Sequence, residues 1–255
     1  MPIIDRLSYQ SRLRFVNTGE KFFFSVFTLF LCAGSRSIPL AVYVFLTAGS
    51  LTVWKGRIPA FRYLQLLSVP LFFLGTNSLI LGLAVRQEPL ELFAYPVGRW
   101  YLTASRETVL YSVRVFLTAM ASVSCLYVLS CSTPMTDFIV FLKRLHIPAL
   151  FIELMVLIYR FIFILMDCAH SISVSQKARL GNRDCKTSLR SFSALISALF
   201  IQAVRRSNLL FDAMESRCYD GSLNVLSEEQ RPRIRELFFI ISYELSALCI
   251  LWLTA

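Results

Sequence analysis

The sequence is poor in charged residues and almost free of histidine. Only 16% of its 255 residues are Asp, Glu, Lys or Arg, and only 2 are His, whereas about a quarter of a soluble domain is charged. Hydrophobic residues make up 56% of the chain, and the mean hydropathy is +0.61. This composition excludes an ordinary soluble domain and indicates a polytopic membrane protein.

Motifs of enzymes and of metal sites are also absent from the sequence. It has no Walker lysine motif, no GxSxG elbow, no HExxH and no glycine-rich cofactor loop. The 7 cysteines form no CxxC pair and fall mostly in or beside apolar runs. His146 and His170 are isolated, and Cys168 would not face His170 on a helix. We therefore expect no catalytic residue, no metal ligand and no cofactor in this chain.

Positive charge exceeds negative charge, with 26 Lys and Arg against 16 Asp and Glu and a net charge of +10. The basic residues have no interleaved aromatics and no recognisable nucleic-acid-binding module, so nucleic acid is not an expected partner. In a membrane protein, excess Lys and Arg mark cytoplasmic loops and lipid headgroup contacts. The lipid bilayer is therefore the expected surroundings.

Five weakly charged runs are candidates for membrane-spanning helices. The first, between Lys21 and Arg36, is short for a ~30 Å hydrocarbon core. We interpret it as a retained helix, because the long basic leader and Leu31 before Cys32 fit a signal peptide poorly. The other four lie between Arg36 and Lys55, between Arg62 and Arg86, between Arg114 and Asp137, and at Leu237–Ala255, where only Glu244 interrupts.

The distribution of charge orients these helices. With the N-terminus in the cytoplasm, the loop Lys55–Arg62 is cytoplasmic and basic, and the mixed loop Arg86–Glu107 lies outside. Residues 143–235 then return to the cytoplasm with most of the remaining positive charge. The expected fold is all-α, with about five transmembrane helices and a cytosolic platform of long helices. The predicted domains are 1–133 (a cytosolic segment and four membrane helices), 134–232 (cytosolic helices) and 233–255 (the last membrane helix).

Proline and glycine divide the predicted cytosolic region into helices. Pro134 ends the fourth span, and Pro148 separates a short amphipathic helix, Met135–Leu145, from a long one that begins near Ala149. The remaining boundaries are a stop near Leu180 before Gly181, a new start within Asp184–Thr187, an end near Tyr219 before Gly221, and Pro232 ahead of the final span.

Two charged residues interrupt the apolar stretch 149–166. Glu153 and Arg160 are seven residues apart, which places them on nearly the same face of a helix. We expect them to bond other helices. Both this stretch and the uncharged run between Arg190 and Arg205 suit helices that lie against other helices or at the membrane surface. A sixth and a seventh span remain an open alternative.

Two Ala-Arg segments occur in this region, Ala178-Arg179-Leu180-Gly181 and Ala213-Met214-Glu215-Ser216-Arg217. On a helix, the second segment extends a stripe that has small or apolar residues between two arginines: Arg206, Leu210, Ala213, Met214 and Arg217. Such a surface can pack into a groove while its guanidinium groups donate to carbonyls or carboxylates. An ordinary solvated cationic face has the same spacing.

Two charges lie in or near predicted spans. Arg114 is at the fourth span and Glu244 is within the last. Lone charges in a bilayer are costly and tend to pair. We therefore predict that these two approach one another or line a groove that faces a partner.

The chain resembles the T component of energy-coupling factor (ECF) transporters, the transmembrane coupling subunit of these ABC importers. The resemblance covers most of the sequence. The two Ala-Arg segments are similar to the paired Ala-Arg-Gly signatures of the family, although Leu180 and Cys218 stand where glycine is usual and Val16-Asn17-Thr18-Gly19 replaces an Asp-Pro-Arg. The other matching stretches are Leu129-Ser130-Cys131-Ser132-Thr133-Pro134, Leu145-His146-Ile147-Pro148, Glu153-Leu154 and Tyr159-Arg160-Phe161-Ile162-Phe163.

The resemblance implies a non-catalytic subunit whose coupling helices rest on two ABC ATPases, which would bind ATP and Mg. Arg179 and Arg217 would each enter a groove of one ATPase. A substrate-binding membrane (S) subunit and a small accessory membrane subunit are further implied partners. The implied coupling residues are Ala178, Arg179, Gly181, Arg206, Ala213, Met214 and Arg217.

The pattern looks closest to the cobalt/nickel (CbiQ-like) branch of the family, in a bacterial cytoplasmic membrane. Ser132-Thr133-Pro134 and the Ala213-Met214-x-x-Arg217 form carry this similarity. A shared T component of a vitamin importer is the alternative. A stand-alone transporter is less consistent with the sequence, because such a protein would be expected to have more spans and inverted repeats.

Overall fold

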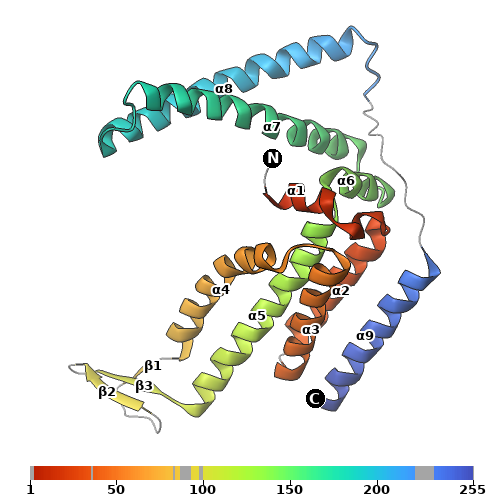
Figure 1. Ribbon diagram of the computed structural model, residues 1–255, viewed down its shortest axis with the longest axis vertical. Helices are drawn as coiled ribbons and strands as arrows, with labels where there is room; N and C mark the ends of the chain where they lie inside the picture. Colours follow the sequence, from red (N-terminus) through yellow and green to blue (C-terminus); the bar gives the residue numbers. More distant parts are fainter. Residues whose placement is uncertain are drawn as a thin grey trace. The chain divides into compact units, whose positions relative to one another are not determined.

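The computed structural model describes residues 3–35, 37–82, 84–86, 93–97, 100–221 and 233–254. Over these ranges helices dominate (Figure 1), and six of them are long and apolar enough to cross a membrane. This confirms an all-α polytopic membrane protein. The chain forms two compact units, one of Pro2–Pro134 with Glu228–Ala255 and one of Met135–Ser227.

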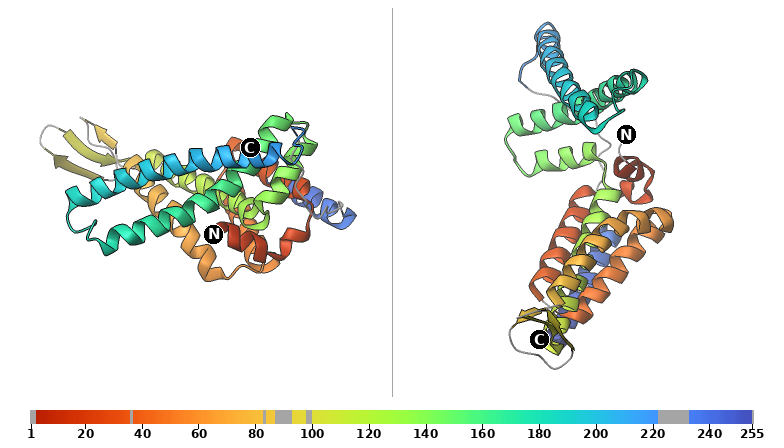
Figure 2. Two further views of the ribbon diagram at one scale, coloured as in Figure 1. Left: turned by 90° about the horizontal axis from the view of Figure 1, so that it is seen from above. Right: turned by 90° about the vertical axis from the view of Figure 1, so that its left-hand side faces the viewer.

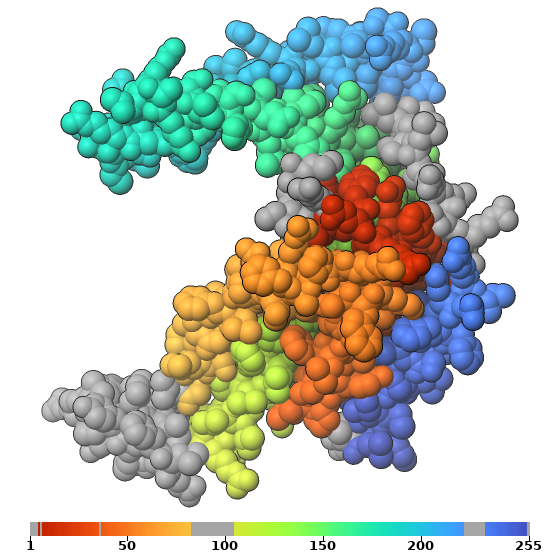
Figure 3. Space-filling model, in the orientation of Figure 1, coloured from red at the N-terminus to blue at the C-terminus, as the bar shows by residue number. Residues whose placement is uncertain are grey.

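The larger unit is a helical bundle organised around α5. Helix α5 contacts α1, α2, α3 and α4, while α9 packs against α2 and α3. The space-filling view shows α4 lying along α5 (Figure 3). The elements are α1 (Ile3–Gln10), the 3₁₀ turn η1 (Arg12–Phe15), α2 (Thr18–Ser35), α3 (Ile38–Ser50) continued by the π-helical turn η2 (Leu51–Lys55), α4 (Ala60–Gly82), α5 (Arg106–Ser132) and α9 (Ile234–Thr254).

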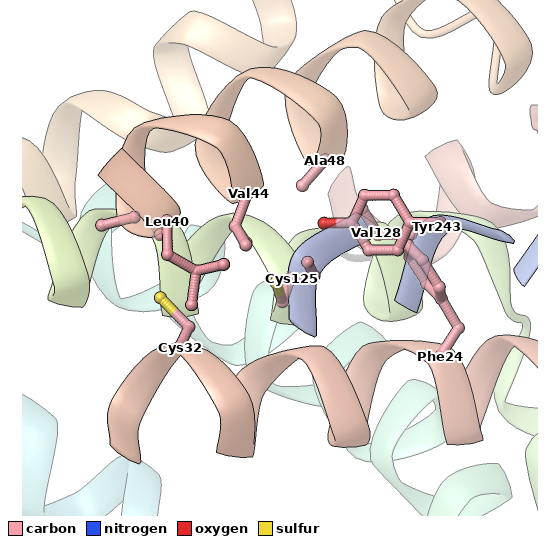
Figure 4. Close-up of a cluster of buried hydrophobic side chains, with 11 residues drawn as sticks. Phe24, Cys32, Leu40, Val44, Ala48, Cys125, Val128 and Tyr243 are labelled. Atoms are coloured by element: carbon pink, nitrogen blue, oxygen red, sulfur yellow. The ribbon is translucent and has the colours of Figure 1, made fainter. Parts of the chain in front are cut away.

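The core of this bundle lies between α2, α3, α5 and α9. Small residues there let the helix backbones approach closely, and the Tyr43 and Tyr243 rings stack with centroids 5.6 Å apart. Tyr43 also hydrogen-bonds Ser246 at 2.7 Å. The buried residues labelled in Figure 4 are Phe24, Cys32, Leu40, Val44, Ala48, Cys125, Val128 and Tyr243.

Four of the five expected spans are among the six candidate helices, as α3 with η2, α4, α5 and α9. The remaining one, α2, corresponds to the first expected span. It is absent from that set because Glu20 and Lys21 lower the mean hydropathy of its 18 residues. Lys21 is buried, and its ammonium donates to the carbonyls of Leu13 and Ser132 at 3.1 Å each. These bonds compensate for the burial of the Lys21 ammonium in the bundle.

A small antiparallel sheet occupies part of the connection between α4 and α5, where the sequence predicted only a loop. Its strands are β1 (Ala84–Arg86), β2 (Phe93–Val97) and β3 (Trp100–Ala104), in the order β1-β3-β2. The register pairs Thr103 of β3 with Ala84 on one side and Ala94 on the other. The segment is rich in aromatic residues, which favour strands.

The second unit consists of α6 (Met135–Arg144), α7 (Ala149–Ala178) and α8 (Cys185–Glu215). Helix α6 packs on α7, and α7 and α8 form a long antiparallel hairpin, seen from further directions in Figure 2. The predicted boundaries at the two prolines are confirmed, since α5 ends before Pro134 and α7 begins after Pro148. Helix α8 ends at Glu215, four residues before the predicted end near Tyr219, because a cap at Cys218 and Tyr219 closes it. By length and composition, α7 and α8 complete the six candidate spans.

Candidate functional site

The two Ala-Arg segments lie at the C-terminal ends of α7 and α8. Arg179 is the C-cap residue of α7, and Arg217 lies two residues beyond the end of α8. Each arginine directly precedes a residue in the left-handed region, Leu180 with φ +57° and Cys218 with φ +58°. The two segments therefore have the same local backbone form.

Hydrogen bonds show that α7 ends in a Schellman motif. The Leu180 N–H donates to the Lys177 carbonyl at 3.1 Å, and the Gly181 N–H donates to the Gln176 carbonyl at 2.8 Å. This pair of bonds satisfies carbonyls that the end of a helix otherwise leaves open. Arg179 is thereby held on a fixed backbone with its side chain exposed.

The end of α8 repeats this motif at the second arginine. The Cys218 N–H donates to the Glu215 carbonyl and the Tyr219 N–H to the Met214 carbonyl, both at 3.1 Å. Arg217 is exposed. The cap thus presents a guanidinium on the same backbone form as at Arg179.

These caps form in spite of the two departures from the resembled signatures. A left-handed backbone costs a residue other than glycine about 1–2 kcal/mol, and Leu180 and Cys218 occupy the positions where the signatures carry glycine. The structure keeps the cap despite the side chains. Both arginines therefore retain the setting that glycine would give them.

Gly181 is required by the turn between α7 and α8. A Cβ there would come within 2.8 Å of the Gln176 carbonyl oxygen and of Ser191 Oγ. Ser191 Oγ donates to the Gly181 carbonyl at 2.9 Å, and Gln176 Nε2 donates to the Ser191 carbonyl at 2.8 Å. These bonds fasten the Arg179 end of the hairpin to α8.

The Arg217 end of the hairpin is fastened to α7. Tyr219 donates its hydroxyl hydrogen to Glu153 Oε2 at 2.6 Å, and Glu153 is only 8% exposed. The hydrogen bond to this carboxylate raises the pKa of Tyr219. Glu153 therefore bonds another segment, as predicted, while Arg160 is exposed.

The predicted stripe on α8 divides in the structure. Arg206, Leu210 and Met214 are half-buried, and Arg206 Nη2 donates to Cys168 Sγ of α7 at 3.6 Å. Ala213 and Arg217 are exposed. Arg206 therefore contributes to the inside of the hairpin, and Arg217 to its outside.

The two exposed arginines lie at opposite ends of the hairpin. Helix α8 has 31 residues and runs antiparallel to α7, so roughly 45 Å of helix separates the two caps at about 1.5 Å per residue. A single small ligand could not span this distance. The arrangement suits two separate macromolecular contacts.

An apolar face of α8 is also uncovered within its unit. The helix has no buried residue, and its large apolar side chains recur at helical spacing. Surfaces of this kind mark protein or membrane contacts. The exposed residues are Leu189, Phe192, Ile196, Phe200, Val204 and Phe211.

The predicted pairing of Arg114 with Glu244 is wrong. Glu244 Oε1 accepts a hydrogen bond from Thr28 Oγ1 at 2.8 Å, because α9 packs on α2 and turns this carboxylate toward it. Arg114 is exposed on α5 and lines a surface hollow with Glu107 and Tyr111. That Arg114 lines a partner-facing groove stays a prediction.

Sequence reasoning missed the bonds that close the hairpin. Gln176–Ser191 and Glu153–Tyr219 join residues 15 and 66 positions apart. The only signal was the proximity of Gln176 and Tyr219 to the two arginines. Over the described ranges, no group of three His, Cys, Asp or Glu residues could hold a metal ion.

Comparisons with known proteins match the sequence to one family. The family model for CbiQ, a cobalt transport protein, matches residues 10–228. The cobalt transport protein CbiQ of Salmonella typhimurium is 28% identical over 223 residues, which cover 87% of this chain and 99% of that protein.

Two further relatives carry related names. A putative fused cobalt transport protein CbiMQ of Methanocorpusculum labreanum is 29% identical over 229 residues, 89% of this chain but 38% of that protein. An energy-coupling factor transporter transmembrane protein EcfT of Ruminiclostridium cellulolyticum is 37% identical over 102 residues, 38% of this chain and 36% of that protein.

Proposed function

Since the chain belongs to the CbiQ family of cobalt transport proteins, we propose that it couples two ABC ATPases to a substrate-binding membrane subunit in a cobalt or nickel importer. The chain is a multi-pass membrane component of a cobalt or ECF-type transporter. The pair of equivalent caps at Arg179 and Arg217 carries the proposal, because each presents an exposed guanidinium at one end of a stiff hairpin.

Each arginine would enter a groove on one ATPase. A guanidinium can make several planar hydrogen bonds to carbonyls or carboxylates there. Loss of a desolvated, paired arginine would cost roughly 3–5 kcal/mol, because its partners stay buried without a donor. Closure of the ATPases on ATP and Mg would then move both ends of the hairpin.

The hairpin is proposed to lie on the cytoplasmic side of the cytoplasmic membrane. Helix α8 carries Arg190, Arg205 and Asp212 on its exposed surface, and charges inside a bilayer are costly. The basic character of residues 143–235 supports the same side. The N-terminus would share that side.

The names of two relatives support cobalt as the proposed cargo. Both are named for cobalt transport, and the fused one joins a region similar to this chain to further sequence. These names support a membrane partner that binds cobalt. We include nickel as an alternative cargo and a small accessory membrane subunit as a further partner in the proposal. The cargo would be captured by the metal-binding partner.

Purification and uptake test this function together. The tagged chain, isolated from membranes of its own cells, is expected to bring down two ABC ATPase copies and a membrane partner. Cells that lack the chain should lose uptake of radioactive cobalt or nickel. Intact metal uptake with lost vitamin uptake would overturn the cobalt/nickel assignment, and the absence of any ATPase would overturn the coupling role.

A further inference from the structure

The bond between Tyr219 and Glu153 connects the last cap of the hairpin to its first helix. Tyr219 lies two positions after Arg217, and its N–H completes the cap of α8 at Met214. Its hydroxyl reaches Glu153 Oε2, near the start of α7, at 2.6 Å. One residue therefore both finishes the cap that carries Arg217 and ties that cap to α7.

Glu153 depends on this single donor. It is 8% exposed, and its other oxygen, Oε1, has no hydrogen-bond partner within the described ranges. Removing the donor to a buried carboxylate costs more folding free energy than an average hydrogen bond contributes. The tie is therefore strong for a surface hairpin in which α8 buries no residue.

The opposite end of the hairpin has a corresponding tie. Gln176, whose carbonyl accepts the bond that closes the α7 cap, donates its side-chain amide to the Ser191 carbonyl of α8 at 2.8 Å. The cap beside Arg179 is thus fixed to α8, as the cap beside Arg217 is fixed to α7. Neither arginine stands on a helix end that can swing by itself.

We infer that Tyr219 is a positioning residue that holds Arg217 in place relative to α7, so that movement of the partner docked at Arg217 passes into α7. The inference rests on the proposed function, in which Arg217 touches the partner and Tyr219 does not. Without the tie, the end of α8 would move with the partner and absorb the displacement. Docking would persist while transmission failed.

The test uses the complete transporter in proteoliposomes and measures metal transported per ATP hydrolysed. Tyr219→Phe is expected to lower this ratio about tenfold, as loss of a bond to a charged acceptor would, with both ATPases still bound. Glu153→Leu should produce the same loss, and the double variant should be no worse than either, because one bond is removed in each case. The single variant Glu153→Gln, with Tyr219 intact, keeps an acceptor oxygen and should retain most of the wild-type ratio.

A control variant removes the hydroxyl of a tyrosine outside the hairpin. Tyr63 on α4 is 6% exposed and belongs to the other compact unit of the chain, so Tyr63→Phe removes no bond within the hairpin and should leave the ratio unchanged. Amide hydrogen exchange at residues 216–221 is a second measurement. Its rate should increase about tenfold in Tyr219→Phe.

The outcomes separate this inference from the proposed function. A normal ratio in Tyr219→Phe, or loss of an ATPase from that variant, would overturn the positioning role. A wild-type chain that binds no ATPase would overturn the proposed function itself. A low ratio in Tyr219→Phe with both ATPases retained, together with a near-normal ratio in the single variant Glu153→Gln, supports the inference.

Discussion

Thr28 on α2 donates a hydrogen bond to the Glu244 carboxylate on α9 at 2.8 Å. The two residues are 216 positions apart, and Thr28 is 1% exposed. The other carboxylate oxygen, Oε2, is buried without a partner among the described residues. This bond therefore links the last helix of the chain to one of the first.

Thr28→Val is expected to destabilise the bundle by about 0.5–1.5 kcal/mol, the range for a hydrogen bond between membrane helices. Thr76→Val on α4 is the matched control, because the exposed Thr76 hydroxyl bonds only the Phe72 carbonyl of its own helix. Thermal unfolding in detergent, followed by circular dichroism, measures both. Equal stabilities for the two variants would contradict a role for the Thr28–Glu244 bond.

Glycine at either cap is expected to stabilise the hairpin. Leu180→Gly and Cys218→Gly each relieve a left-handed backbone in a residue with a Cβ and should add about 1 kcal/mol. Ala178→Gly, at the last residue of α7, should give no such gain and should cost up to about 1 kcal/mol. The same unfolding assay compares them, and destabilisation by both cap glycines would argue against the Schellman geometry.

Alanine at Gly181 is expected to disturb the turn. Its Cβ would meet the Gln176 carbonyl oxygen and Ser191 Oγ at 2.8 Å, which should cost about 1–3 kcal/mol. Gly75→Ala is the control, since no atom lies within 4 Å of the added carbon in α4, and it should be neutral or stabilising by up to ~1 kcal/mol. If Gly181→Ala proves as stable as Gly75→Ala, the turn is looser than described.

Arg206 and its neighbour Arg205 should behave differently. Arg206 contacts Cys168 within the hairpin, so Arg206→Ala should expose that thiol and speed its labelling by a maleimide. Arg205→Ala removes an exposed guanidinium and should leave the labelling rate unchanged. Neither is expected to release an ATPase. An unchanged labelling rate in Arg206→Ala would contradict the contact between Arg206 and Cys168.

Helix boundaries were predictable because proline and glycine act locally. Pro134, Pro148 and Gly221 follow or separate the helices as expected, and the charge pattern identified four of the five expected spans among the candidate helices. The first span was also placed correctly as a helix. Its burial could not be foreseen, because the bonds from Lys21 to Leu13 and Ser132 depend on packing.

The contacts of the candidate site could not be predicted in the same way. Helical spacing placed Arg206 and Arg217 on one stripe, but it could not determine which part of that stripe faces α7. Likewise, the face of α9 that bears Glu244 is set by packing on α2, so Thr28 and not Arg114 became its partner. Pairs far apart in sequence carry no periodic signal.

Release of ATPases by arginine variants tests the coupling role most directly. Copies of the ATPase are counted in complexes purified with the wild-type chain, Arg179→Ala, Arg217→Ala and the double variant, with Arg→Lys versions to separate charge from planar geometry. The account predicts two copies for wild type, about one for each single variant, and none for the double variant. Retention of both copies by the double variant would contradict it.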